Sequence, residues 1–270
     1  MTKLLGVIGD PISHSLSPLI HNGWLRDHRI DATYEAMHVP AGELNLALKT
    51  LESRDVLGVN VTLPHKHDAL AASAKATDAA SKIGAANTLT LKAPGTWHAD
   101  NTDAPGFLHA LGTTQGRQER VLLLGAGGSA RAIVFALTNA KTPVTILNRT
   151  VSKAADLASE LGDDQTVFGD INQYNEYIES ATIVVNTTSM GHSKEYLELP
   201  DGRDRVFFDI SYGKIAAPQL AHAAKQGWQV KDGLTMLVAQ AAFSFDSWFG
   251  VMPDFEKALE RCRRAVEAAQ

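Results

Sequence analysis

The chain has very little cysteine. Cys262 is the only cysteine among 270 residues. A single thiol excludes an internal disulfide and a metal site built from several cysteines, so we expect a protein of the reducing cytoplasm. No run of apolar residues is long enough to cross a bilayer, and the first residues lack the hydrophobic core of a signal peptide.

The chain also lacks a strong excess of charge of either sign. It carries 25 Lys and Arg against 30 Asp and Glu, a formal net charge of −5. Without a basic field we expect no nucleic-acid partner and no membrane partner, and local groups must hold any anionic ligand. Internal repeats and low-complexity segments are missing too. The length suffices for two modest domains, each with its own core.

What the chain does have is a glycine-rich turn between an apolar strand and a helix. The stretch Arg120–Ala130 reads RVLLLGAGGSA. Gly125 allows a tight turn, Gly127 lets the backbone approach a pyrophosphate, and small Ala130 lets the helix pack on the strand. A second strand at 144–148 completes a βαβ unit of the expected length. This context favours a nucleotide cofactor over a plain glycine turn.

The end of that second strand indicates which cofactor. NAD enzymes usually place an acid there to accept hydrogen bonds from the ribose 2′-hydroxyl, whereas this chain has Asn148 followed by Arg149, Thr150 and Lys153. Guanidinium, hydroxyl and ammonium groups are donors suited to a 2′-phosphate. The pattern favours NADP. The alternative is that the two cations are ordinary solvated charges at the start of a surface helix.

Strands and helices alternate along the chain, which predicts an α/β fold with helices on both faces of the sheets. We expect strands at 4–8, 34–39, 58–63, 87–91, 120–124, 144–148, 182–186 and 206–210, and helices at 43–51, 129–137 and 234–243. The polar segment 112–119 is the expected linker into the nucleotide-binding part. Pro253 is expected to open a final helix that buries Cys262.

Two polar clusters are candidates for chemistry. Asn60 and Thr62 share one face of a strand that leads to Lys66, and Asp103 ends a polar turn at 100–103. Each has a plain alternative, because Lys66 could be a solvated lysine and Asp103 a helix cap. Ser17, before Pro18, is a typical N-cap signal. No histidines show the spacing of metal ligands, so we expect no metal site.

Taken together, the motifs resemble those of the shikimate dehydrogenase family in order along essentially the whole chain. They are SHSLSP at 13–18, NVTLPHK at 60–66, AANT at 85–88, DNTD at 100–103, GAGGSA at 125–130, NRT at 148–150, NTTSMG at 186–191 and DGLTMLVAQA at 232–241.

The resemblance implies NADPH-dependent, reversible reduction of 3-dehydroshikimate to shikimate. It implies Lys66 and Asp103 as the catalytic residues. The substrate residues that it implies are Ser15, Ser17, Asn60, Thr62, Asn87, Tyr212 and Gln240. With the glycine turn and the second strand, the expected cofactor site comprises Gly125, Ala126, Gly127, Gly128, Ser129, Ala130, Asn148, Arg149, Thr150, Lys153, Thr187, Thr188, Ser189, Met190, Ile210 and Gly233.

The implied architecture is an N-terminal α/β substrate domain and a Rossmann-type NADP domain, with C-terminal helices that return to the first. The expected boundaries are 1–103 with 234–270, and 104–233, and we expect a monomer or a homodimer. Two alternatives stay open. One is a quinate/shikimate dehydrogenase with broader substrate or NAD use. The other is a non-catalytic NADP-binding regulator, because a fold does not fix a function.

Overall fold

The chain forms two compact units of mixed α/β structure. A computed structural model describes residues 2–112, 119–193 and 196–269. Unit 1 comprises residues 1–106 and 237–265, and unit 2 comprises 107–236 and 266–270. Each unit contains one six-stranded sheet. The predicted α/β class is confirmed, whereas most of the predicted linker at 112–119 lies outside the described residues.

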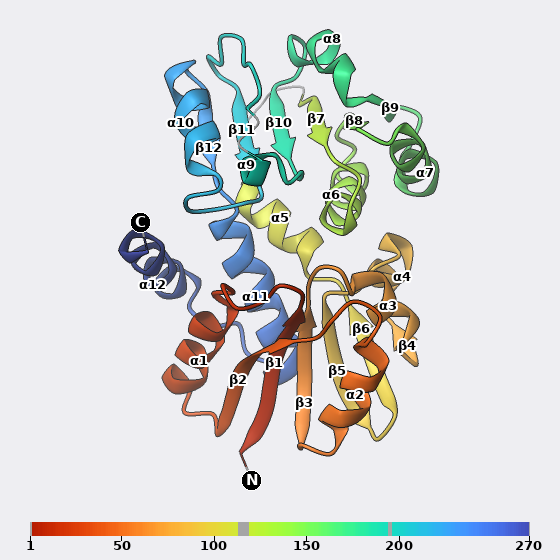
Figure 1. Cartoon of the computed structure of the whole chain (residues 1–270), viewed down its shortest axis with the longest axis vertical. Coiled ribbons are helices and arrows are strands. Elements are labelled where there is room, and N and C mark those ends of the chain that lie inside the picture. The colour runs from red at the N-terminus through yellow and green to blue at the C-terminus, as the bar shows by residue number, and fades with distance from the viewer. Residues whose placement is uncertain (1, 113–118, 194–195, 270) are drawn as a thin grey trace. The chain divides into compact units, whose positions relative to one another are not determined.

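The sheet of unit 1 is mixed, with the strand order β2-β1-β3-β5-β6-β4 (Figure 1). Its strands are β1 (Lys3–Gly9), β2 (Ala32–His38), β3 (Val56–Val61), β4 (Lys75–Ala76), β5 (Thr88–Ala93) and β6 (Thr96–Asp100). β1 pairs in parallel with β2 and β3, whereas β5 runs antiparallel to both β3 and β6. The start of β5 lies between the end of β3 and the end of β6, through the register Asn60↔Thr88↔Asp100, so these two ends share one edge of the sheet.

Helices cover this sheet because apolar residues recur on one side of each. The helices that lie in unit 1 or begin or end in it are α1 (Ser17–Asp27), α2 (Leu44–Glu52), α3 (Lys66–Ala71), α4 (Asp78–Ile83), α5 (Asp103–Leu111), α11 (Leu234–Phe249) and α12 (Phe255–Ala268). Leu44, Leu48 and Leu51 of α2 join the strands in one buried cluster. Trp24 of α1 contacts Phe245 of α11 edge to face, with ring centroids 5.6 Å apart.

The sheet of unit 2 is entirely parallel, with the order β12-β11-β10-β7-β8-β9. Its strands are β7 (Val121–Leu124), β8 (Val144–Asn148), β9 (Val167–Asp170), β10 (Ile183–Asn186), β11 (Val206–Asp209) and β12 (Gln229–Lys231). The helices are α6 (Gly128–Asn139), α7 (Val151–Leu161), α8 (Tyr174–Ile178), α9 (Met190–Ser193) and α10 (Ala217–Lys225), and η1 (Ile171–Gln173) is a 3₁₀ turn. β7, β10 and β11 are fully buried, as expected of strands covered on both faces.

Two predicted helix starts are wrong. Ser17 is the first residue of α1 and Leu16 occupies the N-cap position without a side-chain hydrogen bond. The final helix begins at Phe255, two residues after Pro253, because Asp254 Oδ1 accepts the backbone N–H of Lys257 at 3.0 Å and thereby sets the start. Cys262 is fully buried as predicted, and burial raises its pKa to about 11.

Candidate active site

In unit 1 the structure brings Lys66 and Asp103 together. Lys66 opens α3 just after β3, and Asp103 opens α5 just after β6. Because the ends of β3 and β6 share one edge of the sheet, two residues that are 37 positions apart in sequence come into contact. Lys66 Nζ lies 2.5 Å from Asp103 Oδ2. The side chains are only 10% and 7% exposed. A buried ion pair repays its desolvation only with further hydrogen bonds, so its neighbours matter.

Asn87 supplies one of those bonds. Its Oδ1 accepts the backbone N–H of Thr102 at 2.8 Å, which fixes the orientation of the amide. The Nδ2 group therefore points to Asp103 Oδ1 at 2.8 Å. Each carboxylate oxygen of Asp103 thus accepts a hydrogen bond, Oδ2 from Lys66 and Oδ1 from Asn87. Gln240 of α11 lies next to the same amide, with Oε1 3.3 Å from Asn87 Nδ2.

Asn60 is buried in a polar network on the side of the sheet that α11 covers. Its Oδ1 accepts from the hydroxyl of Tyr34 at 2.7 Å, and its Nδ2 lies 2.9 Å from Oγ of Ser244. Ser244 also lies 2.8 Å from Thr88 Oγ1. The amide of Asn60 is thus fully engaged within the protein. Sequence reasoning missed Ser244, although it stands one helical turn after Gln240 and so shares its face.

The remaining predicted substrate residues divide between the units. Ser15 Oγ accepts the backbone N–H of Ser17 at 3.2 Å, and Ser17 is buried at the start of α1. Thr62 is half-buried just after β3. Tyr212 belongs to unit 2, whereas all other predicted substrate residues belong to unit 1.

A buried aromatic pair borders the Asn60 network. His21 stacks on Tyr34, with ring centroids 4.1 Å apart and 5° between the planes. Burial lowers the pKa of His21 to about 3, against a smaller opposing effect of the neighbouring Asn60 side chain. Burial also raises the pKa of Tyr34. Both rings are therefore uncharged near neutral pH.

In unit 2 the glycine-rich turn lies between β7 and α6. Gly125 has φ +108°, a conformation that favours glycine, and a Cβ there would overlap Thr187 Oγ1. Gly127 is the N-cap of α6, and no side chain caps this helix. A Cβ at Gly127 would meet no atom within 4 Å. The N-terminal amides of α6 are thus open to a ligand, which is the arrangement that binds phosphate.

The residues after β8 offer charge to a ligand. Asn148 Nδ2 donates to the backbone carbonyl of Thr150 at 2.9 Å and shapes the turn. Arg149, Thr150 and Lys153 are exposed, and their side chains form no hydrogen bond or ion pair with another residue that the structure describes. Two unpaired cations and a hydroxyl group at the carboxyl end of a parallel strand fit a phosphate monoester.

The loops after β10 and β11 lie at the same edge of the sheet. Thr187 Oγ1 donates to the carbonyl of Leu124 at 2.7 Å and ties one loop to the end of β7. Gly233 donates its N–H to the carbonyl of Ser211 at 2.8 Å, and a Cβ at Gly233 would overlap the carbonyl oxygen of Ile210. The predicted cofactor residues all lie in unit 2, near the carboxyl ends of β7, β8, β10 and β11 or just before α11: Gly125, Ala126, Gly127, Gly128, Ser129, Ala130, Asn148, Arg149, Thr150, Lys153, Thr187, Thr188, Ser189, Met190, Ile210 and Gly233.

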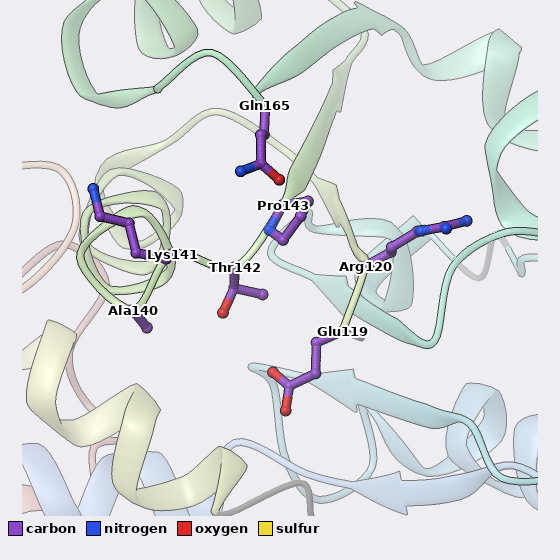
Figure 2. A pocket seen from close by; sticks show the side chains of 7 residues that line it. All are labelled: Glu119, Arg120, Ala140, Lys141, Thr142, Pro143 and Gln165. Carbon is purple, nitrogen blue, oxygen red and sulfur yellow. The ribbon is translucent and has the colours of Figure 1, made fainter. Parts of the chain in front are cut away.

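A cavity of about 650 Å³ lies elsewhere, at the amino edge of this sheet. Figure 2 shows the guanidinium of Arg120 and the ammonium of Lys141 pointing away from each other at its rim. None of the predicted site residues lines it. Because ligands of open parallel sheets bind at the carboxyl ends of the strands, the cavity is not the candidate site.

Two kinds of feature are absent from residues 2–112, 119–193 and 196–269. No group of three or more His, Cys, Asp or Glu is arranged to hold a metal ion. Within the same residues, none of the helices combines the length and the hydrophobicity that a transmembrane segment requires.

Comparison with known families shows which family the chain belongs to. Three family models match in order: the shikimate dehydrogenase substrate binding domain over residues 7–89, shikimate/quinate 5-dehydrogenase over 110–224, and the shikimate 5′-dehydrogenase C-terminal domain over 233–263. The chain belongs to the shikimate dehydrogenase family. The NADP(+)-dependent shikimate dehydrogenase of Hyphomonas neptunium is 50% identical over 99% of both chains.

Solved structures of the shikimate dehydrogenase family share the whole fold. The enzyme from Aquifex aeolicus is 33% identical with a TM-score of 0.88, and the match covers 97% of this chain and 98% of that one. The enzyme from Thermus thermophilus, solved in complex with NADP(H) and shikimate, is 34% identical with a TM-score of 0.84 over 97% and 99% of the two chains. The predicted family and fold are confirmed.

Proposed function

We propose that this chain catalyses the reversible, NADPH-dependent reduction of 3-dehydroshikimate to shikimate. The observation that best supports this proposal is the buried Lys66–Asp103 pair, an ammonium and a carboxylate 2.5 Å apart beside Asn87 and Gln240. Its context supports the proposal, because the relatives matched over the full length are NADP(+)-dependent shikimate dehydrogenases.

The residues of the pair have distinct roles. NADPH, when bound, supplies the hydride that reduces the ketone. The ammonium of Lys66 stabilises the negative charge that develops on the ketone oxygen and delivers a proton to it. Asp103 orients Lys66 and accepts a hydrogen bond from a substrate hydroxyl. The bond from Asn87 holds the carboxylate of Asp103 in place for both tasks.

The substrate is proposed to lie among polar residues near this pair. Ser15 and Ser17 bind the substrate carboxylate, and Thr62, Asn87 and Gln240 contact the ring. Asn60 is proposed to lie beside the ring, with its amide held by Tyr34 and Ser244. Tyr212, which belongs to unit 2, stays a predicted substrate residue. The predicted boundaries 1–103 with 234–270, and 104–233, stand as proposed substrate and NADP domains.

NADP is the proposed cofactor because both parts of its site fit. The open N-terminus of α6 at Gly127 leaves room for the pyrophosphate, and Arg149, Thr150 and Lys153 offer donors to the 2′-phosphate. Two charge-assisted hydrogen bonds would give a preference over NAD of about a hundredfold or more. We expect Arg149→Ala to lose most of that preference in kcat/KM.

One panel of assays tests the function against its alternatives. Cofactor absorbance is followed with shikimate or quinate, each paired with NADP or NAD. We expect turnover to be fastest with shikimate and NADP. Comparable rates with quinate or NAD would favour the broader quinate/shikimate dehydrogenase. Absence of turnover in every pairing would favour the non-catalytic regulator. The cytoplasmic location and the monomeric or homodimeric state stay predictions.

A further inference from the structure

Two buried polar side chains at the edge of the unit 2 sheet are not used by the mechanism above. Asn186 ends β10 and Asp209 ends β11, and the two residues are register partners in adjacent parallel strands. Each is only 2% exposed. Asn186 Nδ2 donates to Asp209 Oδ2 at 2.9 Å. This buried pair therefore links the ends of two neighbouring strands directly.

Each member of the pair also bonds to the loop that follows its own strand. Asn186 Oδ1 accepts the backbone N–H of Thr188 at 3.0 Å and its hydroxyl at 2.7 Å. Asp209 Oδ1 accepts the backbone N–H of Ser211 at 2.8 Å. The backbone N–H of Thr188 identifies the oxygen of the Asn186 amide, whereas both oxygens of Asp209 are acceptors and each has its own donor. The orientation of both side chains is thus determined, and each fixes the first turn of its loop.

The burial of the Asp209 carboxylate costs folding free energy. Asp209 is buried, and its partners in the described ranges are the amide of Asn186 and the backbone N–H of Ser211, with no cation among them. Burying a charge without a counter-ion costs free energy that an apolar pair of similar size would avoid. The pair is therefore poorly explained by stability alone. What it provides is a defined conformation of two loops.

We propose that Asn186 and Asp209 are positioning residues that shape the NADP site. The inference rests on the proposed function, because the two loops carry the proposed cofactor residues Thr187, Thr188 and Ile210. The pair acts on the cofactor through those loops and does not contact the substrate. Loss of its hydrogen bonds should weaken NADP binding and leave shikimate binding to unit 1 unchanged.

An exchange of the two side chains tests this. Asn186→Asp sets two carboxylates against each other. In Asp209→Asn, the new amide has one oxygen for the two donors that Asp209 accepts from, Asn186 Nδ2 and the backbone N–H of Ser211, so one donor loses its acceptor. The double variant N186D/D209N restores every bond, because the new amide at position 209 can donate to the new carboxylate at position 186 and still accept from Ser211 N–H. The carboxylate at position 186 still accepts from Thr188.

Affinities for NADP and for shikimate are measured separately by titration calorimetry on purified full-length protein. We expect each single variant to weaken NADP binding about tenfold, with the Kd of shikimate within about twofold of the wild type. The double variant should return to within about threefold of wild-type NADP affinity. Gln219→Glu is the matched control, since it converts another buried amide of unit 2, one bonded to the backbone of Leu197, and should leave NADP affinity unchanged.

The outcomes separate positioning from structural support. Folded single variants with wild-type NADP affinity would overturn the proposal, as would a double variant that binds NADP as weakly as the singles or does not fold. An equal loss of NADP affinity in the control variant Gln219→Glu would also overturn the proposal. If a single variant does not fold, the double variant decides alone. Wild-type turnover of shikimate with NADP is measured alongside, so that a failure of the proposed function is seen separately.

Discussion

At the scale of single residues, the chemistry depends on a charge pair that the fold has taken out of water. Lys66 and Asp103 are both nearly buried, and Asn87 bonds to the carboxylate. Removing one partner of such a pair leaves the other charge buried alone, at a cost of about 3–5 kcal/mol in stability. Variants of this pair therefore need a stability measurement beside every rate.

Lys66→Ala removes the proposed proton donor. We expect kcat to fall by about 10²–10⁴-fold, while the dissociation constants of shikimate and NADP change much less. Added ethylamine should restore part of the rate by entering the space that the side chain vacates. Lys82→Ala, on the exposed surface of α4, is the control and should keep wild-type kinetics. Near-normal turnover of the Lys66 variant would refute the role.

His21 gives a prediction about pH. Its pKa is lowered by burial to about 3 in the folded state, against 6.5 in the unfolded chain. Between these values the unfolded state binds the additional proton, so stability falls as the pH falls below 6.5. At pH 5 the loss is about 2 kcal/mol. Urea unfolding of wild type and His21→Phe at pH 5 and 8 checks this, since the phenylalanine variant lacks the titration. Parallel pH profiles would contradict it.

At the scale of elements, the sequence predicted most strands because their apolar runs are long. It missed β6, although Trp97 and Ala99 are buried on alternate positions after the turn at Gly95. It also missed α4 and α8, which have six and five residues and are too short to show a helical period.

The candidate site was predictable only in part. Lys66 and Asp103 could be named from motifs, but their contact follows from the antiparallel pairing of β5, which no local pattern reveals. The role of Ser244 was hidden for the same reason, because its partners Asn60 and Thr88 come from two other elements. Local patterns reveal elements, whereas tertiary pairing decides which side chains meet.

The glycine turn before α6 allows a contrast between two substitutions. Gly127→Ala places a methyl group in open space at an ordinary φ of −88°, so the free energy of unfolding should fall only by the cost of alanine at an N-cap, about 1 kcal/mol or less. The methyl group should raise the KM for NADP about tenfold or more by obstructing the pyrophosphate. Gly125→Ala, at φ +108° and against Thr187, should instead lower stability by about 1–3 kcal/mol. Equal effects of the two variants on NADP binding and stability would contradict this division.

At the scale of the whole molecule, the two ligands are assigned to different units. The proposed NADP contacts lie in unit 2, and the proposed substrate contacts, apart from Tyr212, lie in unit 1. A ligand stabilises the state it binds by RT ln(1 + [L]/Kd), about 2.7 kcal/mol at a hundred times its Kd. Each ligand alone should therefore slow local opening mainly in its own unit.

Hydrogen exchange followed by mass spectrometry can localise that protection. With NADP alone we expect slower exchange in peptides that cover residues 121–131, 144–153 and 183–190, at the ends of β7, β8 and β10. With shikimate alone we expect it in peptides that cover residues 12–20, 58–68 and 86–104. Peptides from β9, at the edge of the unit 2 sheet, serve as an internal reference and should exchange equally in all samples. Protection by shikimate confined to unit 2 would contradict the assignment, because Lys66, Asp103 and Asn87 would then have no ligand to hold.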